Sequence, residues 1–130
     1  MLPTTFNKRS IALLTDLYEI TMANGYFEEG RKDTEVVFDV FYRQIPDQGG
    51  FAIFAGLEQI VEYIEHLHFT SEDVDYLRSL NLFSEPFLQY LANFSFTGNI
   101  DAIAEGTVIY PNEPLMTVTA PIIEAQLIET

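Results

Sequence analysis

The residues best suited to chemistry lie in the stretch "LLTDLYEITMANGYF", residues 13–27. Read as a helix, its three- and four-residue spacing gathers a tyrosine hydroxyl, a threonine and a glycine on one stripe, which a face built only for packing does not need. The stripe, predicted to turn towards protein, comprises Leu14, Leu17, Tyr18, Thr21, Met22 and Gly25. We therefore expect this face to meet either a plain core or a small ligand.

Three polar residues on or beside this stripe are candidates for binding a ligand. Tyr18 offers an aromatic wall on which a flat ring could stack, and the alternative is a tyrosine of the core. Asp16 could orient a ligand, but it stands where a helix N-cap belongs, so capping competes with that role. Thr21 could line the same pocket or bond its own helix.

Arg43 is a fourth candidate, and it differs from the other basic residues in its setting. Among the six lysines and arginines, only Arg43 is embedded among aromatic residues, after an apolar segment and before a Pro-Asp-Gln-Gly-Gly turn. A guanidinium binds phosphate or carboxylate through its bidentate fork. The alternative is a salt bridge to a strand neighbour or to another subunit.

Two other patterns predict no site. His66 and His68 are two residues apart, so they share no helix face, and no third ligand accompanies them. They are interpreted as solvated or packing histidines. The stretch "DQGGFAIFAG" contains glycines but lacks the Gly-Lys-Ser/Thr of a phosphate loop, so its glycines are assigned to a turn.

Composition predicts one folded domain in the cytoplasm. The 130 residues are 48% hydrophobic, with 11 Phe and 7 Tyr, which excludes a disordered chain. No apolar run approaches the ~18–20 residues that span a bilayer, and the start lacks the apolar region of a signal peptide. The absence of cysteine excludes disulfides and thiolate metal sites. The formal charge of −14 argues against binding nucleic acid.

Local signals in the first two thirds of the chain predict four helices and two strands. We expect a helix from about Thr15 to Glu28, with Thr15 or Asp16 as N-cap and Gly30 just past its end. Alternating apolar residues predict a strand over 34–44, the turn "IPDQGG" breaks it, and "FAIF" at 51–54 is interpreted as a short buried strand. Further helices are predicted over 57–67, over 70–80 after Thr70 or Ser71, and over 84–94 after Ser84.

The last third of the chain predicts short strands followed by a helix. The segments 99–105, 107–110 and 115–119, with the turn "PNEP" among them, are typical of a small barrel or sandwich-like unit. Pro121 begins a helix that breaks off in mid-pattern without a capping residue, so we expect the sequence to be the N-terminal part of a longer protein. We expect that helix to expose its apolar residues, which are Ile122, Ile123, Leu127 and Ile128.

Three segments in order resemble the N-terminal part of nicotinate phosphoribosyltransferases. They are "LLTDLYEITMANGYF", "FDVFYRQIPDQGGFAIFAGLEQIVEYI" and "EGTVIYPNEPLMTVTAPIIEAQLIET". The resemblance implies an enzyme that joins nicotinate to 5-phosphoribosyl-1-pyrophosphate, giving nicotinate mononucleotide for NAD biosynthesis, with ATP hydrolysis and Mg²⁺. It also implies an α+β fold, the α/β-hammerhead N-terminal domain over residues 1–130. Residues 121–130 would begin a helix leading into an α/β barrel that this chain lacks.

The same resemblance implies roles for individual residues and for the assembly. The family's tyrosine at the position of Tyr18 stacks on the pyridine ring, and the arginine of "F-x-R-x-x-P", here Arg43, lies near the active site. The phosphate-binding loops and the phosphorylated histidine belong to the barrel, so no catalytic residue is predicted within this chain. Family members form homodimers whose active sites lie near the subunit interface.

Two other functions compete with this interpretation. A related phosphoribosyltransferase could act on quinolinate or nicotinamide, although the segment "TDLYEITM" resembles the nicotinate branch. A non-enzymatic carrier domain also uses short hammerhead-like strands, but it needs a lysine on an exposed hairpin. No lysine lies between Asn99 and Thr119, so the carrier interpretation is rejected.

Overall fold

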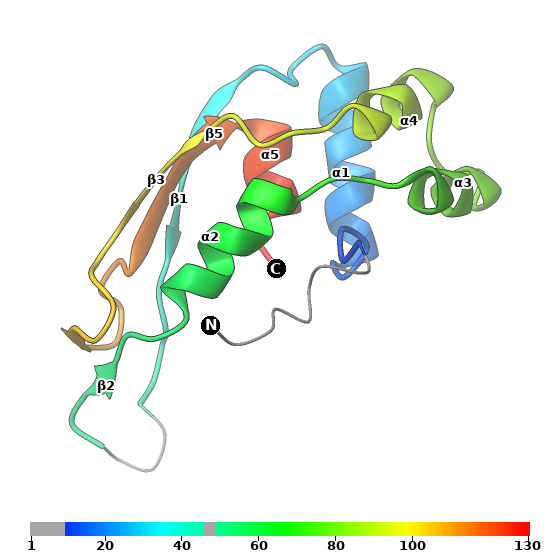
Figure 1. Ribbon diagram of the computed structural model, residues 1–130. Coiled ribbons are helices and arrows are strands. Elements are labelled where there is room, and N and C mark those ends of the chain that lie inside the picture. The colour runs from blue at the N-terminus through cyan, green and yellow to red at the C-terminus, as the bar shows by residue number, and fades with distance from the viewer. Residues whose placement is uncertain (1–9, 46–48) are drawn as a thin grey trace.

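The computed structural model describes residues 10–45 and 49–130, so the polar lead-in at 1–9 and part of the predicted turn, 46–48, lie outside the described residues. Helices and strands alternate in blocks along the chain (Figure 1). The elements, in order, are α1 Leu17–Glu28, β1 Glu35–Val40, β2 Ala52–Ile53, α2 Leu57–His66, α3 Ser71–Ser79, α4 Glu85–Ala92, β3 Asn99–Ala102, β4 Val108–Ile109, β5 Met116–Pro121 and α5 Ile122–Leu127. The predicted α+β class is confirmed.

The strands form two separate antiparallel sheets. β5 is the central strand of the larger sheet, whose order is β1-β5-β3, with Val36 opposite Ala120 and Ile100 opposite Val118. β2 and β4 form a two-stranded ribbon beyond the end of that sheet. The predicted barrel or sandwich-like unit is therefore wrong, because β2 pairs with β4 alone and never joins the larger sheet.

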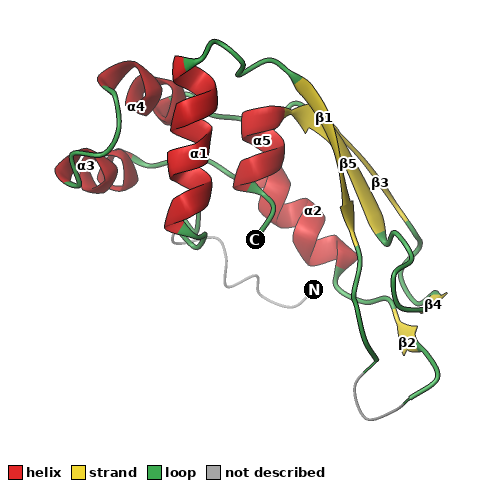
Figure 2. Ribbon diagram, turned by 180° about the vertical axis from the view of Figure 1, so that it is seen from behind, coloured by secondary structure: helices red, strands yellow, loops and turns green. Residues whose placement is uncertain are grey.

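The helices lie on one side of the larger sheet (Figure 2). The main core fills the space among α1, α3, α4 and α5, and its largest fully buried apolar side chains are Phe87, Leu77, Leu88, Leu91 and Ile123. A second cluster lies between the sheet and α5 and includes Met116, Val118, Ala120 and Ala125. Burying these apolar surfaces holds α1 and the sheet in a fixed relation through α5.

Both ends of α1 follow from local chemistry. The helix begins at Leu17, with Asp16 extended at the N-cap position. At its other end, Gly30 adopts a φ of 68°, the Gly30 N–H donates to Phe27 and the Arg31 N–H donates to Tyr26 at 2.8 Å. This is a Schellman ending, which favours glycine because a side chain at positive φ is strained. The prediction that Gly30 follows the helix is confirmed.

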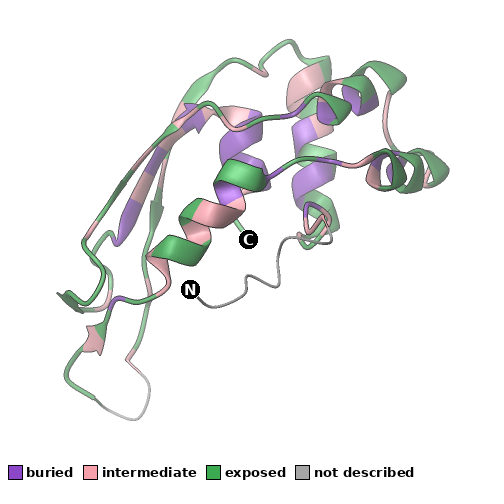
Figure 3. Ribbon diagram, viewed as in Figure 1, coloured by how far each residue is buried: buried purple, intermediate pink, exposed green. Residues whose placement is uncertain are grey.

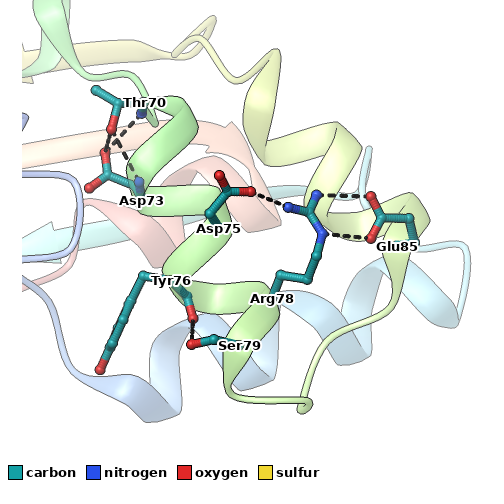
Figure 4. A network of polar contacts seen from close by, with 7 residues as sticks. All are labelled: Thr70, Asp73, Asp75, Tyr76, Arg78, Ser79 and Glu85. Atoms are coloured by element: carbon teal, nitrogen blue, oxygen red, sulfur yellow. Dashed lines mark hydrogen bonds and ion pairs between the residues drawn. The ribbon is translucent and has the colours of Figure 1, made fainter.

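The starts of α3 and α4 are confirmed as well. Thr70 and Asp73 form a capping box, in which the Thr70 hydroxyl accepts from the Asp73 N–H and the Asp73 carboxylate accepts from the Thr70 N–H. Ser84 caps α4 by accepting from the Phe87 N–H. Arg78 then ties the two helices together through a two-pronged contact with Glu85 (Figure 4).

The expectation that the last helix exposes its apolar side is wrong. Ile123 and Leu127 are 0% and 3% exposed, and Ile122 and Ile128 are partly buried. Their partner is α1, which packs directly against α5 within this chain. The helix is also shorter than residues 121–130, since it spans Ile122–Leu127 with Ile128 at its C-cap.

The interpretation of "FAIF" as a buried strand is also wrong. Phe51 and Ile53 are 56% and 51% exposed, whereas Phe54 is buried and Ala52 is partly buried. Only one face of this segment is packed, with Ala52 and Phe54 in a cluster with Ile109 and Leu115. Because alternate side chains of a strand point to opposite faces, Phe51 and Ile53 stand on the other side.

Candidate functional site

The stripe of α1 that was predicted to face protein lies on the surface of the described chain. Leu14 is 76% exposed, Leu17 and Tyr18 are each 50% exposed and Met22 is 42% exposed. The buried residues of α1 are instead Glu19, Ile20 and Ala23. Figure 3 shows buried and exposed stretches alternating along α1. The stripe is an exposed apolar surface, so the prediction of a protein-facing stripe is corrected for this chain.

Tyr18 lies at the surface, and its hydroxyl is hydrogen bonded to a neighbouring side chain. Its ring is half exposed, and its hydroxyl donates to Oε1 of Glu19 at 3.5 Å. Partial burial raises the pKa of Tyr18, and the negative charges of Glu129, Glu19 and Asp16 raise it further. The hydroxyl therefore stays protonated at neutral pH. Tyr18 can present a ring face and a hydrogen-bond donor, and it cannot serve as a base.

Asp16 and Thr21 lie near the start of α1, and they differ in whether their side chains form hydrogen bonds with the helix. Asp16 is exposed at the N-cap position, yet its carboxylate makes no capping hydrogen bond, so the capping role is not what the structure shows. Thr21 is exposed on the same stripe as Tyr18, and its hydroxyl donates to the Tyr18 carbonyl at 3.0 Å. The alternative in which Thr21 bonds its own helix is confirmed, on an exposed side chain.

Arg43 lies in another part of the molecule. It is exposed and follows β1 by three residues, in the segment that leads to the β2–β4 ribbon and away from α1 (Figure 1). No ion pair joins it to an acidic residue within 10–45 and 49–130. Its neighbour Tyr42 is anchored, donating its hydroxyl to the Ile109 carbonyl at 2.9 Å. The structure brings Tyr18, Asp16 and Thr21 together and leaves Arg43 apart from them.

The side chains of His66 and His68 each form a hydrogen bond with a backbone carbonyl. Nδ1 of His66 lies 2.8 Å from the Glu62 carbonyl, and Nδ1 of His68 lies 2.7 Å from the His66 carbonyl. A carbonyl can only accept, so Nδ1 is the donor in each of these two contacts. Within the described part of the chain, no group of three or more His, Asp or Glu side chains is arranged to hold a metal ion.

Glu19 is the polar residue that sequence reasoning missed. It is 0% exposed, and its carboxylate accepts hydrogen bonds from the hydroxyls of Thr15, Tyr18 and Thr130. The sequence carries one weak signal, because Thr15 stands four residues before Glu19 on the same helical face. The contact with Thr130 depends on how α5 packs, which no local pattern encodes.

Glu105 performs a second unpredicted task. Its two carboxylate oxygens accept from the N–H groups of Gly56 and Leu57, each at 2.9 Å, and so cap α2 from a distant loop. Gly56 occupies the N-cap with a φ of 105° and offers no side chain for the task. A shallow hollow beside this contact is lined by Leu57, Glu58, Val61 and Glu105. A carboxylate at a helix N-terminus satisfies orphan donors, so the arrangement accounts for Glu105 structurally.

None of the helices in the described ranges has the length and apolarity that crossing a bilayer requires.

Comparison with known proteins connects these features to one family. Residues 13–130 match the family described as the nicotinate phosphoribosyltransferase N-terminal domain. The chain is 50% identical over 119 residues to nicotinate phosphoribosyltransferase pncB2 of Mycobacterium tuberculosis, covering 92% of this chain and 26% of that protein. It is 44% identical to the nicotinate phosphoribosyltransferase of Bacillus subtilis, covering 100% of this chain and 26% of that protein.

A solved structure agrees with the sequence relatives. The crystal structure of human nicotinic acid phosphoribosyltransferase matches with a TM-score of 0.81 and 33% identity, over 88% of this chain and 24% of that one. The chain thus spans about a quarter of the length of these relatives. The family match over residues 13–130 includes every helix and strand described above. By sequence and by fold, this chain belongs to the nicotinate phosphoribosyltransferase N-terminal domain family.

Proposed function

We propose that this chain is the N-terminal domain of an enzyme that transfers phosphoribosyl from 5-phosphoribosyl-1-pyrophosphate to nicotinate, giving nicotinate mononucleotide for NAD biosynthesis. The observation that carries the proposal is Tyr18, half exposed on an apolar stripe in a chain of this family. A flat pyridine ring needs an aromatic or apolar wall, and Tyr18 offers one at the surface. Leu17 and Met22 extend that wall along α1.

The transfer needs positioning more than proton movement. The lone pair of the pyridine nitrogen attacks the anomeric carbon of the ribosyl group, the bond from that carbon to pyrophosphate breaks, and pyrophosphate leaves with the electron pair. The nitrogen becomes formally positive and no proton is exchanged. Tyr18 would hold the ring plane for this attack, and its raised pKa is compatible with that role because only the neutral phenol is needed.

The proposal gives supporting contacts with the substrates to three other residues, Asp16, Thr21 and Arg43. Asp16, just before α1, and Thr21, on the same face of α1 as Tyr18, would border the ring. Arg43 would meet an anionic substrate group near the β2–β4 end, apart from the Tyr18 wall. An exposed guanidinium suits phosphate or carboxylate there.

Mg²⁺, which the resemblance implies together with ATP, does not fit the residues described here. A magnesium site needs oxygen ligands gathered at one point, and the described residues offer no such group of acidic side chains. The carboxylate of Glu19, the acid nearest the core, is occupied by hydroxyls. We propose that both groups bind outside this chain, in a cytoplasmic enzyme acting as a homodimer. The exposed apolar stripe of α1 supports a covering partner.

The substrate assignment is tested with the full-length protein that carries this domain. Nicotinate, nicotinamide and quinolinate are each supplied with 5-phosphoribosyl-1-pyrophosphate, Mg²⁺ and ATP, and mononucleotide formation is followed by chromatography. The proposal predicts the highest kcat/KM for nicotinate. A higher value for quinolinate or nicotinamide, or no transfer to any of the three, would contradict it.

A further inference from the structure

We propose that Glu19 is a positioning residue that fixes the Tyr18 ring at the nicotinate site by anchoring the tyrosine hydroxyl from inside the protein. This inference rests on the proposed function, since it assumes that Tyr18 contacts nicotinate. Glu19 does not itself reach the substrate, because its side chain is 0% exposed.

The burial of Glu19 is unusual and calls for a reason. Burying a carboxylate is costly unless it is paired or richly hydrogen bonded. No lysine or arginine forms an ion pair with it among residues 10–45 and 49–130. Its hydrogen-bond donors are instead three hydroxyls, from Thr15 before α1, Tyr18 within α1 and Thr130 beyond α5.

The two carboxylate oxygens divide these donors. Oε2 accepts from Thr15, which holds the carboxylate against the start of α1. Oε1 accepts from Thr130 and, at 3.5 Å, from the Tyr18 hydroxyl. α1 and α5 pack against each other, and Glu19 thus links the start of α1 to the segment that follows α5. The carboxylate that holds the Tyr18 hydroxyl is itself held by Thr15 before α1 and by Thr130 after α5.

The Tyr18 ring lacks other restraints of this kind. It is half exposed, and no aromatic pair of the described residues includes it. A freely rotating side chain loses conformational entropy when a ligand stacks on it, and this loss weakens binding. A hydrogen bond from the hydroxyl to a buried carboxylate restricts the ring before the ligand binds, so less entropy is lost on binding. Nearby carboxylates also raise the pKa of Tyr18, so its hydroxyl remains a donor.

A double-mutant cycle in the full-length enzyme tests the inference. Glu19→Ala is made with Tyr18 present and again in the Tyr18→Phe background, and kcat and KM for nicotinate are measured for each. With Tyr18 present, Glu19→Ala should raise the nicotinate KM about fivefold with little change in kcat. In the Tyr18→Phe background the same change should be about neutral, because the hydroxyl through which Glu19 acts is gone.

Conservative and matched variants separate positioning from folding. Glu19→Gln keeps an acceptor at that point and should hold the KM to within about twofold of the parent. Glu124→Gln alters another buried carboxylate, one that serves the loop at Thr97 and Gly98, and should leave the nicotinate KM unchanged. If Glu19→Ala does not fold, Glu19→Met keeps the bulk, removes both oxygens and serves in the same cycle.

The outcomes distinguish this inference from the proposed function. If Tyr18→Ala raises the nicotinate KM but Glu19→Ala acts equally with Tyr18 and with Phe at position 18, the inference is overturned and the proposed stacking stands. If Tyr18→Ala leaves the KM unchanged, the stacking itself is contradicted and the inference falls with it. A fivefold effect that disappears in the Tyr18→Phe background supports both.

Discussion

At the scale of single residues, the approach of β3 to β5 is decided by Gly98. Glu124, which is 6% exposed, accepts from the Thr97 N–H at 2.6 Å, the Thr97 hydroxyl at 2.9 Å and the Gly98 N–H at 3.2 Å. These bonds draw the chain tightly over β5. A Cβ atom at position 98 would lie 2.4 Å from the Cβ of Ala120 and 2.8 Å from the Thr119 carbonyl oxygen.

Gly98→Ala should therefore destabilise the fold. Relieving those contacts requires a shift of backbone, so we expect the free energy of unfolding to fall by about 2 kcal/mol, measured by urea denaturation. Gly25→Ala is the matched control, because nothing lies within 4 Å of a Cβ at this helical position. The control should raise the free energy of unfolding by roughly 0.5–1 kcal/mol. Equal effects at the two sites would refute the packing argument.

At the scale of elements, helix starts depend on residues close in sequence. The capping box of α3 joins Thr70 and Asp73, and Ser84 caps α4 four residues after the chain leaves Leu80. Each cap satisfies backbone donors that no helical carbonyl can reach. Arg78 of α3 then bridges the two helices by donating to Glu85 of α4.

Removing the Thr70 hydroxyl should weaken α3. Thr70→Ala is expected to lower the free energy of unfolding by about 1 kcal/mol, because the Asp73 N–H loses its acceptor. Ser71→Ala, at the exposed first position of the helix, is the control and should change stability by less than about 0.5 kcal/mol. Thermal melts of both variants give the comparison. A control as damaging as Thr70→Ala would rule out the cap as the cause.

The same capping box makes stability depend on pH. Burial alone would raise the pKa of Asp73, but hydrogen bonds from the Thr70 hydroxyl and N–H hold that pKa below the ordinary 3.8. A carboxyl with a lowered folded-state pKa stabilises the fold above its unfolded pKa, and this stabilisation is lost as pH falls through the folded value. Asp73→Asn should therefore lose less stability than the parent on acidification below pH 3.8. Parallel slopes in unfolding curves at several pH values would contradict this assignment.

The elements also show how far sequence reasoning extends. The ends of α1, α3 and α4 were predictable because Gly30, Thr70 and Ser84 act on their immediate neighbours. Burial was less predictable, because it depends on which element covers a face. The apolar side of α5 is buried by α1, and the α1 stripe is exposed because α5 packs on the opposite side.

In the candidate site, too, local spacing predicted some features, whereas others depend on tertiary packing. The spacing around Tyr18 predicted that Tyr18 and Thr21 share one face of the helix, and the structure shows both of them exposed on that face. The burial of Glu19 and its contact with Thr130 could not be predicted, since they link residues 111 positions apart. Arg43 was grouped with these residues by its guanidinium chemistry and by the resemblance of its motif, and the structure places it beyond β1.

At the scale of the whole molecule, the structure has a helical end and a ribbon end connected by the β1-β5-β3 sheet (Figure 2). The Tyr18 wall belongs to the first and Arg43 to the approach to the second. The chain spans about a quarter of its relatives' length, and its described residues hold no metal-binding group. Under the proposed function, the Tyr18 wall would be one part of an active site and would not suffice alone for phosphoribosyl transfer.

The isolated 130-residue chain should accordingly form no nicotinate mononucleotide. The expected result with nicotinate, 5-phosphoribosyl-1-pyrophosphate, Mg²⁺ and ATP is product at the level of a protein-free control, measured by mass spectrometry. The full-length enzyme is the positive control in the same buffer. Product from the isolated chain above the protein-free level would mean that it contains a complete site after all.

The central claim is that Tyr18 provides the wall for the pyridine ring, and one paired measurement tests it most directly. Melting temperature and nicotinate kinetics are determined for Tyr18→Ala and Tyr18→Phe in the full-length enzyme. Tyr76→Ala, at an exposed tyrosine of α3, is the matched control.

Tyr18→Ala should weaken nicotinate binding by ~1–3 kcal/mol with little loss of melting temperature, because a half-exposed ring contributes more to stacking than to the core. Tyr18→Phe keeps the ring and should cost less, and Tyr76→Ala should leave the nicotinate KM unchanged. A sharp fall in melting temperature for Tyr18→Ala without any change in nicotinate kinetics would contradict the account.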